Sequence, residues 1–210
     1  MPHLEQIFEH KIVAILRGMP PAEIIHIATA LYNGGVRLLE VTLNSENALP
    51  VIEQLSHEFK DKMIIGAGTV LDTKDAANAI DAGAAFLISP NLDLNVIGTA
   101  KKAGVVSIPG AFTPTEILAA HNNGADIVKI FPCLNAAYIK NILAPLNNVK
   151  VMPNGGIDAT NIHTFAATGA VAFGIGSALV DSKASVNETY LQQLTAKAQE
   201  LITALNKVKK

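Results

Sequence analysis

A repeated unit of about twenty residues constrains the fold of this 210-residue chain more than any other feature. In each unit, a segment with helical spacing of its apolar residues leads to a glycine, and a short apolar strand follows. The spacing of the glycines matches the length of one helix and one strand joined by short loops. Eight strands are predicted, at residues 11–18, 36–43, 63–70, 85–90, 105–110, 127–132, 150–156 and 170–176.

Eight such units without a break in composition predict one α/β domain, residues 1–210, folded as a closed (β/α)8 TIM barrel. An open, doubly wound sheet is the alternative fold. It would leave two edge strands, whereas all eight predicted strands are similarly apolar. Two helix starts are also predicted, because residues 113–116 and residues 185–188 both have the capping-box pattern.

Composition and charge exclude several classes of function. A formal charge of −2, without any cluster of lysine or arginine, provides no basic surface for nucleic acid. No apolar run approaches the roughly 18 residues of a membrane span, and the N-terminus lacks a signal-peptide pattern. The single cysteine, Cys133, excludes an internal disulfide and fits a reducing compartment. We therefore expect a cytoplasmic protein that binds neither nucleic acid nor membrane.

Metal ions and cofactors are not expected. The six histidines lie on predicted helices or near the N-terminus, and no His-Glu-x-x-His or paired-aspartate motif occurs. The glycine-containing segments 66–71 and 174–179 do not complete a dinucleotide fingerprint. Cys133 has no histidine near it in sequence, so we interpret it as a packing residue rather than a nucleophile. Any chemistry should therefore come from protein side chains alone.

Two lone charges interrupt otherwise apolar strands. Lys129 stands in residues 127–132, where burial would remove hydration from its amine and lower the pKa. A neutral amine can form a Schiff base with a ketone. The alternative is that the aliphatic part of the Lys129 side chain packs in the core while its ammonium group reaches solvent or pairs with an acidic residue. Glu40 stands in residues 38–43, where a buried carboxyl group could relay protons through a positioned water. The alternative for Glu40 is a structural ion pair with Lys129 or Arg17.

Glycines end the last two predicted strands. Gly155 and Gly156 end the seventh strand, and Gly176 followed by Ser177 ends the eighth. In a barrel, these are positions where backbone N–H groups at a helix start bind phosphate. Gly-Gly pairs also form ordinary turns, but their coincidence on both strands favours a phosphate site.

The order of these residues resembles the 2-keto-3-deoxy-6-phosphogluconate (KDPG) / 4-hydroxy-2-oxoglutarate (KHG) aldolase family, whose members are class I aldolases. The resemblance spans essentially the whole chain and rests on residues 15–18, 40–43, 65–71, 88–90, 108–110, 128–132, 155–157 and 176–177. It implies a (β/α)8 barrel, usually a homotrimer, whose partner is a small phosphorylated keto-acid substrate. The implied reaction cleaves a 2-keto-3-deoxy-6-phospho sugar acid, or 4-hydroxy-2-oxoglutarate, to pyruvate and glyceraldehyde 3-phosphate or glyoxylate.

The resemblance also implies roles for individual residues. Lys129 would form the Schiff base, and Glu40 would be the general acid/base. The implied substrate-binding residues are Arg17, Asn44, Thr69, Pro90 and Phe131, and the implied phosphate-binding residues are Gly155, Gly156, Gly176 and Ser177. The implied mechanism needs no metal ion or cofactor, because the iminium group itself accepts the electrons.

One departure from the family pattern concerns the aldehyde half of the substrate. Many members continue Glu-Val-Thr-Leu with Arg-Thr, and that arginine helps to bind the pyruvyl carboxylate. This chain has Asn44 and Ser45 instead, similar to the branch that acts on the galactonate epimer, and Arg17 could supply the missing charge. Two other functions stay open: a sugar-phosphate epimerase or isomerase that uses Lys129 and Glu40 as acid and base, and a non-catalytic phosphosugar-binding barrel.

Overall fold

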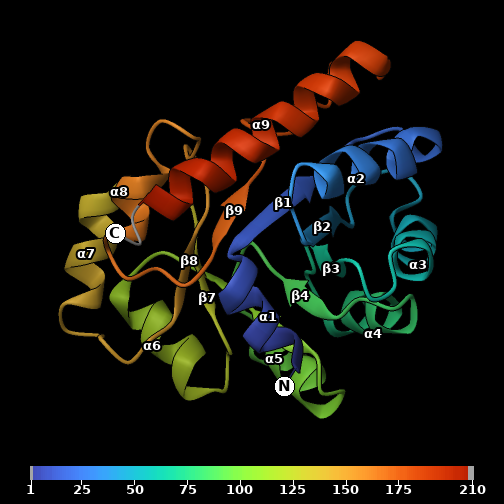
Figure 1. The fold of residues 1–210 in the computed structure, drawn as a ribbon. Helices are drawn as coiled ribbons and strands as arrows, with labels where there is room; N and C mark the ends of the chain where they lie inside the picture. The colour runs from blue at the N-terminus through green and yellow to red at the C-terminus, as the bar shows by residue number, and fades with distance from the viewer. Residues whose placement is uncertain (1, 208–210) are drawn as a thin grey trace.

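The computed structural model describes residues 2–207 and has an α/β architecture, with short strands in the middle and helices packed around them (Figure 1). The strands are β1 (Ile12–Leu16), β2 (Leu38–Thr42), β3 (Ile64–Gly68), β4 (Phe86–Ile88), β5 (Val106–Ile108), β6 (Gly110–Ala111), β7 (Val128–Ile130), β8 (Val151–Pro153) and β9 (Phe173–Ile175). The helices are α1 (Pro2–His10), α2 (Ile24–Asn33), α3 (Ala48–Glu58), α4 (Thr73–Asp81), α5 (Leu94–Lys102), α6 (Pro114–Asn122), α7 (Ala136–Leu143), α8 (Ile162–Ala166) and α9 (Glu188–Asn206), and a 3₁₀ turn, η1 (Pro21–Glu23), precedes α2. Within residues 2–207, none of the helices combines the length and the apolar character needed to cross a lipid bilayer.

The paired strands run parallel and form two sheets. The larger sheet has the order β5-β4-β3-β2-β1-β9, and the smaller sheet has the order β6-β7-β8. Pro109 separates β5 from β6, because proline has no N–H group to donate to the ladder. An isolated parallel bridge between Asn154 and Gly174 connects the end of β8 to β9. The predicted parallel α/β fold is confirmed, whereas the strands are paired as two sheets rather than as one continuous ring of eight.

Alternate residues of the strands face two different apolar layers, as expected for strands that are buried on both faces. Leu39 of β2 packs in the layer shared with the surrounding helices, together with Ile27 of α2. Its neighbour Leu38 faces the inner layer, where it joins Phe86 of β4 and Ile7 of α1. Helix α1 therefore covers the amino-terminal ends of the strands, which leaves their carboxyl-terminal ends available for a site.

Local capping decides where two of the helices begin. The hydroxyl of Thr113 accepts the N–H of Glu116 at 3.4 Å, and the Glu116 carboxylate accepts the N–H of Thr113 at 2.7 Å. These bonds confirm the predicted capping box at the start of α6. The second predicted box, at Ser185, is wrong. Helix α9 begins later, because the side chain of Asn187 accepts the N–H of Tyr190 at 3.0 Å and takes the capping position.

The strand β1 lies between β2 and β9, so segments from the two ends of the chain are neighbours. On the outer side, α9 packs against α2 (Figure 1), and Gly34 makes the close approach possible. A Cβ atom at Gly34 would lie 2.5 Å from the Cβ atom of Ala198. The hydroxyl of Thr195 also donates to the carbonyl of Ala30 at 2.9 Å, which fixes the two helices to each other.

Candidate active site

The two lone charges predicted as catalytic residues both lie within buried strands. Glu40 is the middle residue of β2, and its neighbours in the ladder are Ile15 of β1 and Gly66 of β3. Lys129 is the middle residue of β7, opposite Gly110 of β6. The side chain of Glu40 is fully buried, and Lys129 is 4% exposed. The prediction of two buried ionisable side chains is therefore confirmed.

The Glu40 carboxyl group has no partner in the part of the chain that the structure describes. Both carboxyl oxygens are buried, and neither forms a hydrogen bond. Among residues 2–207, no ion pair within 4.0 Å joins Glu40 to Lys129 or Arg17, so the structural ion pair considered from the sequence is not formed. Burial raises the pKa of Glu40, and the charges of Lys129 and Arg17 oppose this increase. A carboxyl group with a raised pKa can both donate and accept a proton near neutral pH.

The Lys129 amine lies in an environment that favours its neutral form. Burial is the largest cause and lowers the pKa of Lys129, the Glu40 carboxylate opposes the decrease, and the positive charge of Arg17 adds to it. The Nζ atom lies 5.0 Å from the centre of the Phe131 ring, a contact that by itself favours the charged form. Because the neutral amine is the nucleophile, this arrangement supports attack on a carbonyl carbon.

A pocket of about 260 Å³ gives access to Lys129. Its lining residues are Ile15, Arg17, Lys129, Phe131, Asn154, Gly176, Ser177, Val180 and Ser182. Five of these were predicted from the sequence as site residues, and the fold brings them together from the ends of β1, β7 and β9. The other four lining residues were not predicted as site residues from the sequence; they are Ile15, Asn154, Val180 and Ser182. For Asn154, the available signal was a polar residue directly after an apolar strand.

Six predicted residues do not line this pocket. Glu40 is fully buried within β2. The other five follow the carboxyl-terminal ends of strands; they are Asn44, Thr69, Pro90, Gly155 and Gly156. Asn44 is exposed in the turn after β2. Thr69 follows β3 with a φ of 58°, and Gly155 and Gly156 follow β8 with φ of 111° and 66°. A left-handed conformation is costly for threonine, and residues held in such conformations cluster at functional sites. The contacts of these five residues with substrate stay predictions.

Ser45, which was not among the predicted site residues, connects two strand ends. Its hydroxyl accepts the N–H of Gly18 at 2.9 Å and lies 3.0 Å from the hydroxyl of Thr42. Gly18 directly follows Arg17, so Ser45 fixes the backbone from which the Arg17 side chain extends. The signal in the sequence was that the Arg-Thr pair of the family pattern is replaced by Asn-Ser, which changes the first residue but keeps a hydroxyl at the second.

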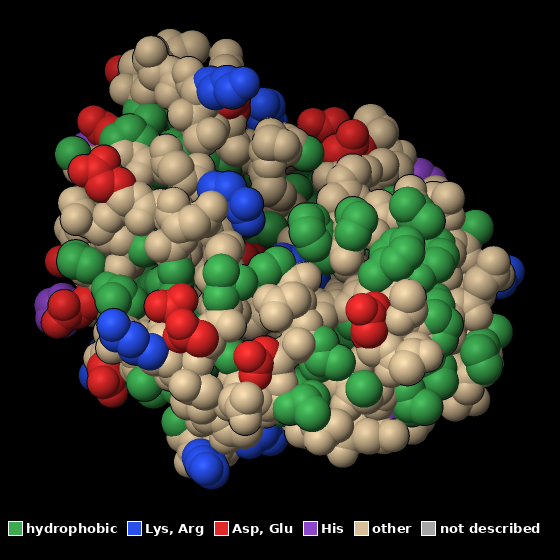
Figure 2. Space-filling model, turned by 180° about the vertical axis from the view of Figure 1, so that it is seen from behind, with side chains coloured by type: hydrophobic (Ala, Val, Ile, Leu, Met, Phe, Trp, Pro, Cys, Tyr) green, Lys and Arg blue, Asp and Glu red, His purple; other side chains and the backbone are tan. Residues whose placement is uncertain are grey.

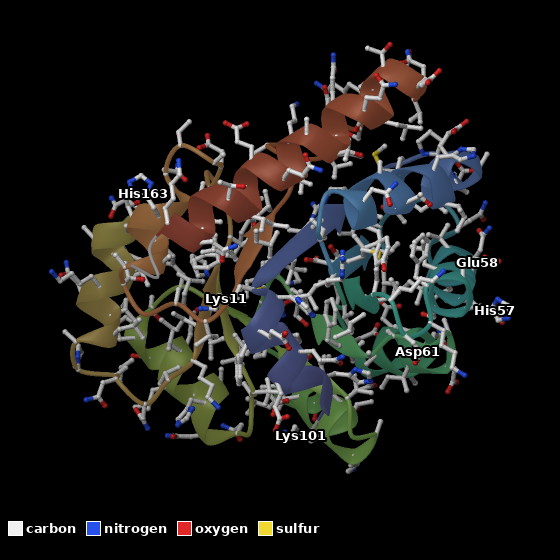
Figure 3. All side chains as sticks on the ribbon, viewed as in Figure 1. Lys11, His57, Glu58, Asp61, Lys101 and His163 are labelled. Carbon is white, nitrogen blue, oxygen red and sulfur yellow. The ribbon has the colours of Figure 1, made fainter. Side chains whose placement is uncertain are left out.

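Side chains that could hold a metal ion do not gather in the described part of the chain. No group of three or more His, Cys, Asp or Glu side chains is arranged for metal binding within residues 2–207. His57 and His163 project from α3 and α8 on opposite sides of the molecule (Figure 3). Burial raises the pKa of the Cys133 thiol to about 11, so the thiol is protonated at neutral pH and is a poor nucleophile.

Comparison with known proteins places the chain in a family. The family model described as KDPG and KHG aldolase matches residues 4–196. The probable 2-dehydro-3-deoxy-6-phosphogalactonate aldolase of Rhizobium meliloti (strain 1021) is 38% identical to the chain over 174 residues, which are 81% of this chain and 82% of that protein.

Two solved structures have closely similar folds. A structure described as native KDPGal has a TM-score of 0.88 and 29% sequence identity, and the match covers 94% of this chain and 95% of that one. The KDPG aldolase of Legionella pneumophila, with pyruvate captured at low pH as a covalent carbinolamine intermediate, has a TM-score of 0.85 and 27% identity, and the match covers 94% and 97%. The resemblance inferred from the sequence motifs is thereby confirmed. The chain belongs to the KDPG and KHG aldolase family and is an aldolase.

Proposed function

We propose that this aldolase is a class I enzyme that cleaves a 2-keto-3-deoxy-6-phospho sugar acid, or 4-hydroxy-2-oxoglutarate, to pyruvate and an aldehyde. The observation that carries the proposal is the buried amine of Lys129, which lines a pocket and whose pKa is lowered by burial. The Legionella pneumophila relative supports it, because a carbinolamine is the first covalent product of an amine and a ketone.

The first half of the reaction forms the iminium ion. The neutral Nζ atom of Lys129 adds to the C2 carbonyl carbon of the substrate, and a carbinolamine results. Glu40, directly or through water, donates a proton to its hydroxyl group, which leaves as water, so that a C=N bond with a positive charge on nitrogen and an ionised Glu40 remain. Burial favours the neutral amine needed for this attack, and the same low polarity strengthens the interaction of the iminium charge with Glu40.

The second half breaks the C3–C4 bond. The Glu40 carboxylate accepts the proton of the C4 hydroxyl, directly or through water, while the C3–C4 bonding electrons move to the iminium group and form an enamine. The C4 atom leaves as the aldehyde. Glu40 then returns the proton to C3, and hydrolysis of the new iminium releases pyruvate and the free Lys129 amine. The raised pKa of Glu40 suits a group that must accept and return one proton.

The residues around Lys129 are proposed to bind the substrate. Arg17 is an exposed cation that lines the pocket, and it would bind the pyruvyl carboxylate in place of the arginine that the family pattern has at Asn44. Phe131 would form one wall of the pyruvate site. The Ser177 hydroxyl and the backbone N–H groups near Gly176 would bind the phosphate at the other side of the pocket.

The proposal includes a closed (β/α)8 barrel that assembles as a homotrimer. Two contacts across the breaks between the sheets support closure: the bridge from Asn154 to Gly174, and the N–H of Ile127, which donates to the carbonyl of Ser107 in β5 at 3.3 Å. The exposed large apolar side chains within residues 2–207 are Leu71, Leu94, Leu118, Phe131 and Leu134. Hydrophobic side chains gather on one side of the face in Figure 2, and such surfaces favour association with further subunits.

Reductive trapping tests the Schiff base. Borohydride added together with pyruvate should inactivate the enzyme and leave a reduced pyruvyl group on Lys129, which peptide mass mapping would locate. Lys150 is a matched control, because its amine lies 4.9 Å from the centre of the Phe8 ring but the residue is exposed. The Lys150→Arg variant should be labelled by pyruvate and borohydride to the same extent as the wild type, and the Lys129→Arg variant should not be labelled. An unmodified Lys129, with label elsewhere or nowhere, would refute the mechanism.

A further inference from the structure

Position 68, the last residue of β3, requires glycine because a side chain would not fit there. The backbone conformation at this position does not itself require glycine. The φ of Gly68 lies outside the positive range that favours glycine, unlike the φ of 58° at the following residue, Thr69. A Cβ atom on residue 68 would overlap Oε1 of Glu40 and lie 2.5 Å from its Cδ atom and 2.6 Å from its Cγ atom. The Glu40 side chain therefore occupies the volume that any other residue at position 68 would require.

The atoms that obstruct a side chain at Gly68 all belong to one flexible side chain. At Gly66, two residues earlier in β3, a Cβ atom would overlap the buried ring of Phe86. At Gly110, it would overlap the backbone of Pro90. A methyl group at residue 68 would instead press on the outer atoms of Glu40, so the strand can keep its position while the carboxyl group moves.

We propose that Gly68 is a positioning residue for the aldolase reaction, because it leaves free the space in which the Glu40 carboxyl group lies. The inference rests on the acid–base role proposed for Glu40. Within the described residues, no hydrogen bond or ion pair holds this fully buried carboxyl group, so packing alone locates it. On the β3 side, the packing surface is the bare backbone of Gly68, and a shift of about 1 Å at a reacting group can lower a rate about 10²-fold.

A double-mutant cycle between residues 40 and 68 tests the inference. Glu40→Ala should lower kcat by about 10²–10⁴-fold, the usual effect of losing a general acid or base. Gly68→Ala should lower kcat at least about tenfold, with a smaller effect on pyruvate trapping at Lys129, because the amine itself is not displaced. The double variant should be no slower than Glu40→Ala alone. If Gly68→Ala lowers kcat by the same factor in both backgrounds, the positioning role is overturned.

Thermal unfolding of the same proteins provides a second measurement that does not depend on turnover. Gly68→Ala should lower Tm when residue 40 is glutamate and have little effect when residue 40 is alanine, because the alanine vacates the obstructed space. Gly66→Ala is the matched control: its obstruction is Phe86, so it should destabilise both backgrounds equally. Equal destabilisation by Gly68→Ala in both backgrounds, or failure to fold in both, would overturn the inference.

The two measurements also separate this inference from the function on which it rests. If Glu40→Ala keeps near-normal turnover, the proposed acid–base role fails, and Gly68 then has no catalytic group to position. If Glu40→Ala loses turnover but residues 40 and 68 act independently in kcat and in Tm, the acid–base role stands and only the role of Gly68 fails. Coupling in both measurements supports both proposals.

Discussion

Replacing Glu40 with glutamine should stabilise the fold at neutral pH while it removes most of the turnover. Glutamine has nearly the same shape and keeps two polar atoms, but it cannot ionise, so the substitution isolates the cost of the buried ionisable group. In the wild type, both carboxyl oxygens are buried without a hydrogen-bond partner among the described residues. Imine formation at Lys129 should continue slowly, and kcat should fall by about 10²–10⁴-fold.

The stabilisation has an upper limit. Glu40 can always avoid carrying a buried charge by taking up a proton, so its cost at pH 7 cannot exceed the free energy of protonation between its ordinary pKa of 4.5 and that pH. At about 1.4 kcal/mol per pH unit, the limit is about 3.5 kcal/mol. We therefore expect Glu40→Gln to raise the free energy of unfolding by about 1–3 kcal/mol, with a Tm increase of about 2–4 °C per kcal/mol.

The stability of Glu40→Gln relative to the wild type should increase as the pH rises. Burial raises the pKa of Glu40 in the folded state, so the wild type has its full relative stability below the unfolded-state pKa, where both states are protonated. As the pH rises, the unfolded chain releases the proton first, and the wild type becomes progressively less stable than the variant. The difference stops growing once the folded carboxyl group also ionises. Urea unfolding followed by circular dichroism between about pH 4.5 and 8 measures this difference.

Glu58→Gln is the control, because Glu58 is an exposed carboxylate on α3. It should change the free energy of unfolding by less than about 0.5 kcal/mol. The reasoning would be refuted if Glu40→Gln were less stable than the wild type at pH 7, or if the difference were independent of pH. Either result would mean that the charges of Lys129 and Arg17 compensate a buried carboxylate, which is then a structural ion.

Arg17→Ala should weaken pyruvate binding by about 1.5–3 kcal/mol, the range for hydrogen bonds to charged groups, while Asn44→Ala should change the preference between C4 epimers. Imine trapping measures both affinities, and the opposite pattern would exchange the two roles. Ser177→Asp should raise KM for phosphorylated substrates only, and an equal effect on 4-hydroxy-2-oxoglutarate would remove the phosphate site. Thr113→Ala should lower the free energy of unfolding by about 1 kcal/mol, and an unchanged urea midpoint would contradict its capping role. Activity should survive EDTA, whereas loss that Mg²⁺ or Zn²⁺ restores would identify a metal-dependent aldolase.

The strands and the two central side chains could be predicted because their signals are local. A lone lysine or glutamate in an apolar stretch is visible in the sequence, and Lys129 and Glu40 are both buried as expected. The convergence of Arg17, Phe131 and Ser177 on one pocket follows from topology, because parallel strands have their carboxyl ends at the same edge.

The contacts that could not be predicted depend on register and on the paths of loops. That Gly68 lies against Glu40 follows from the pairing of β2 with β3, which the composition of either strand does not specify. Ser185 and Asn187 are both suitable N-cap residues, and the choice between them depends on the path of the chain after β9. The contact between Ser45 and Gly18 joins two turns that are distant in sequence, so no local pattern indicates it.

Because β1 lies between β2 and β9 in the larger sheet, it is exposed to incorrect pairing while the protein is being synthesised. Ile12 begins β1, and its partner in β9 is Phe173, so the strand gains its second neighbour only when most of the chain has left the ribosome. At about 5–20 residues per second, the delay is roughly 10–30 s. Throughout that interval, one edge of a wholly apolar strand offers unpaired N–H and C=O groups to any other nascent chain nearby.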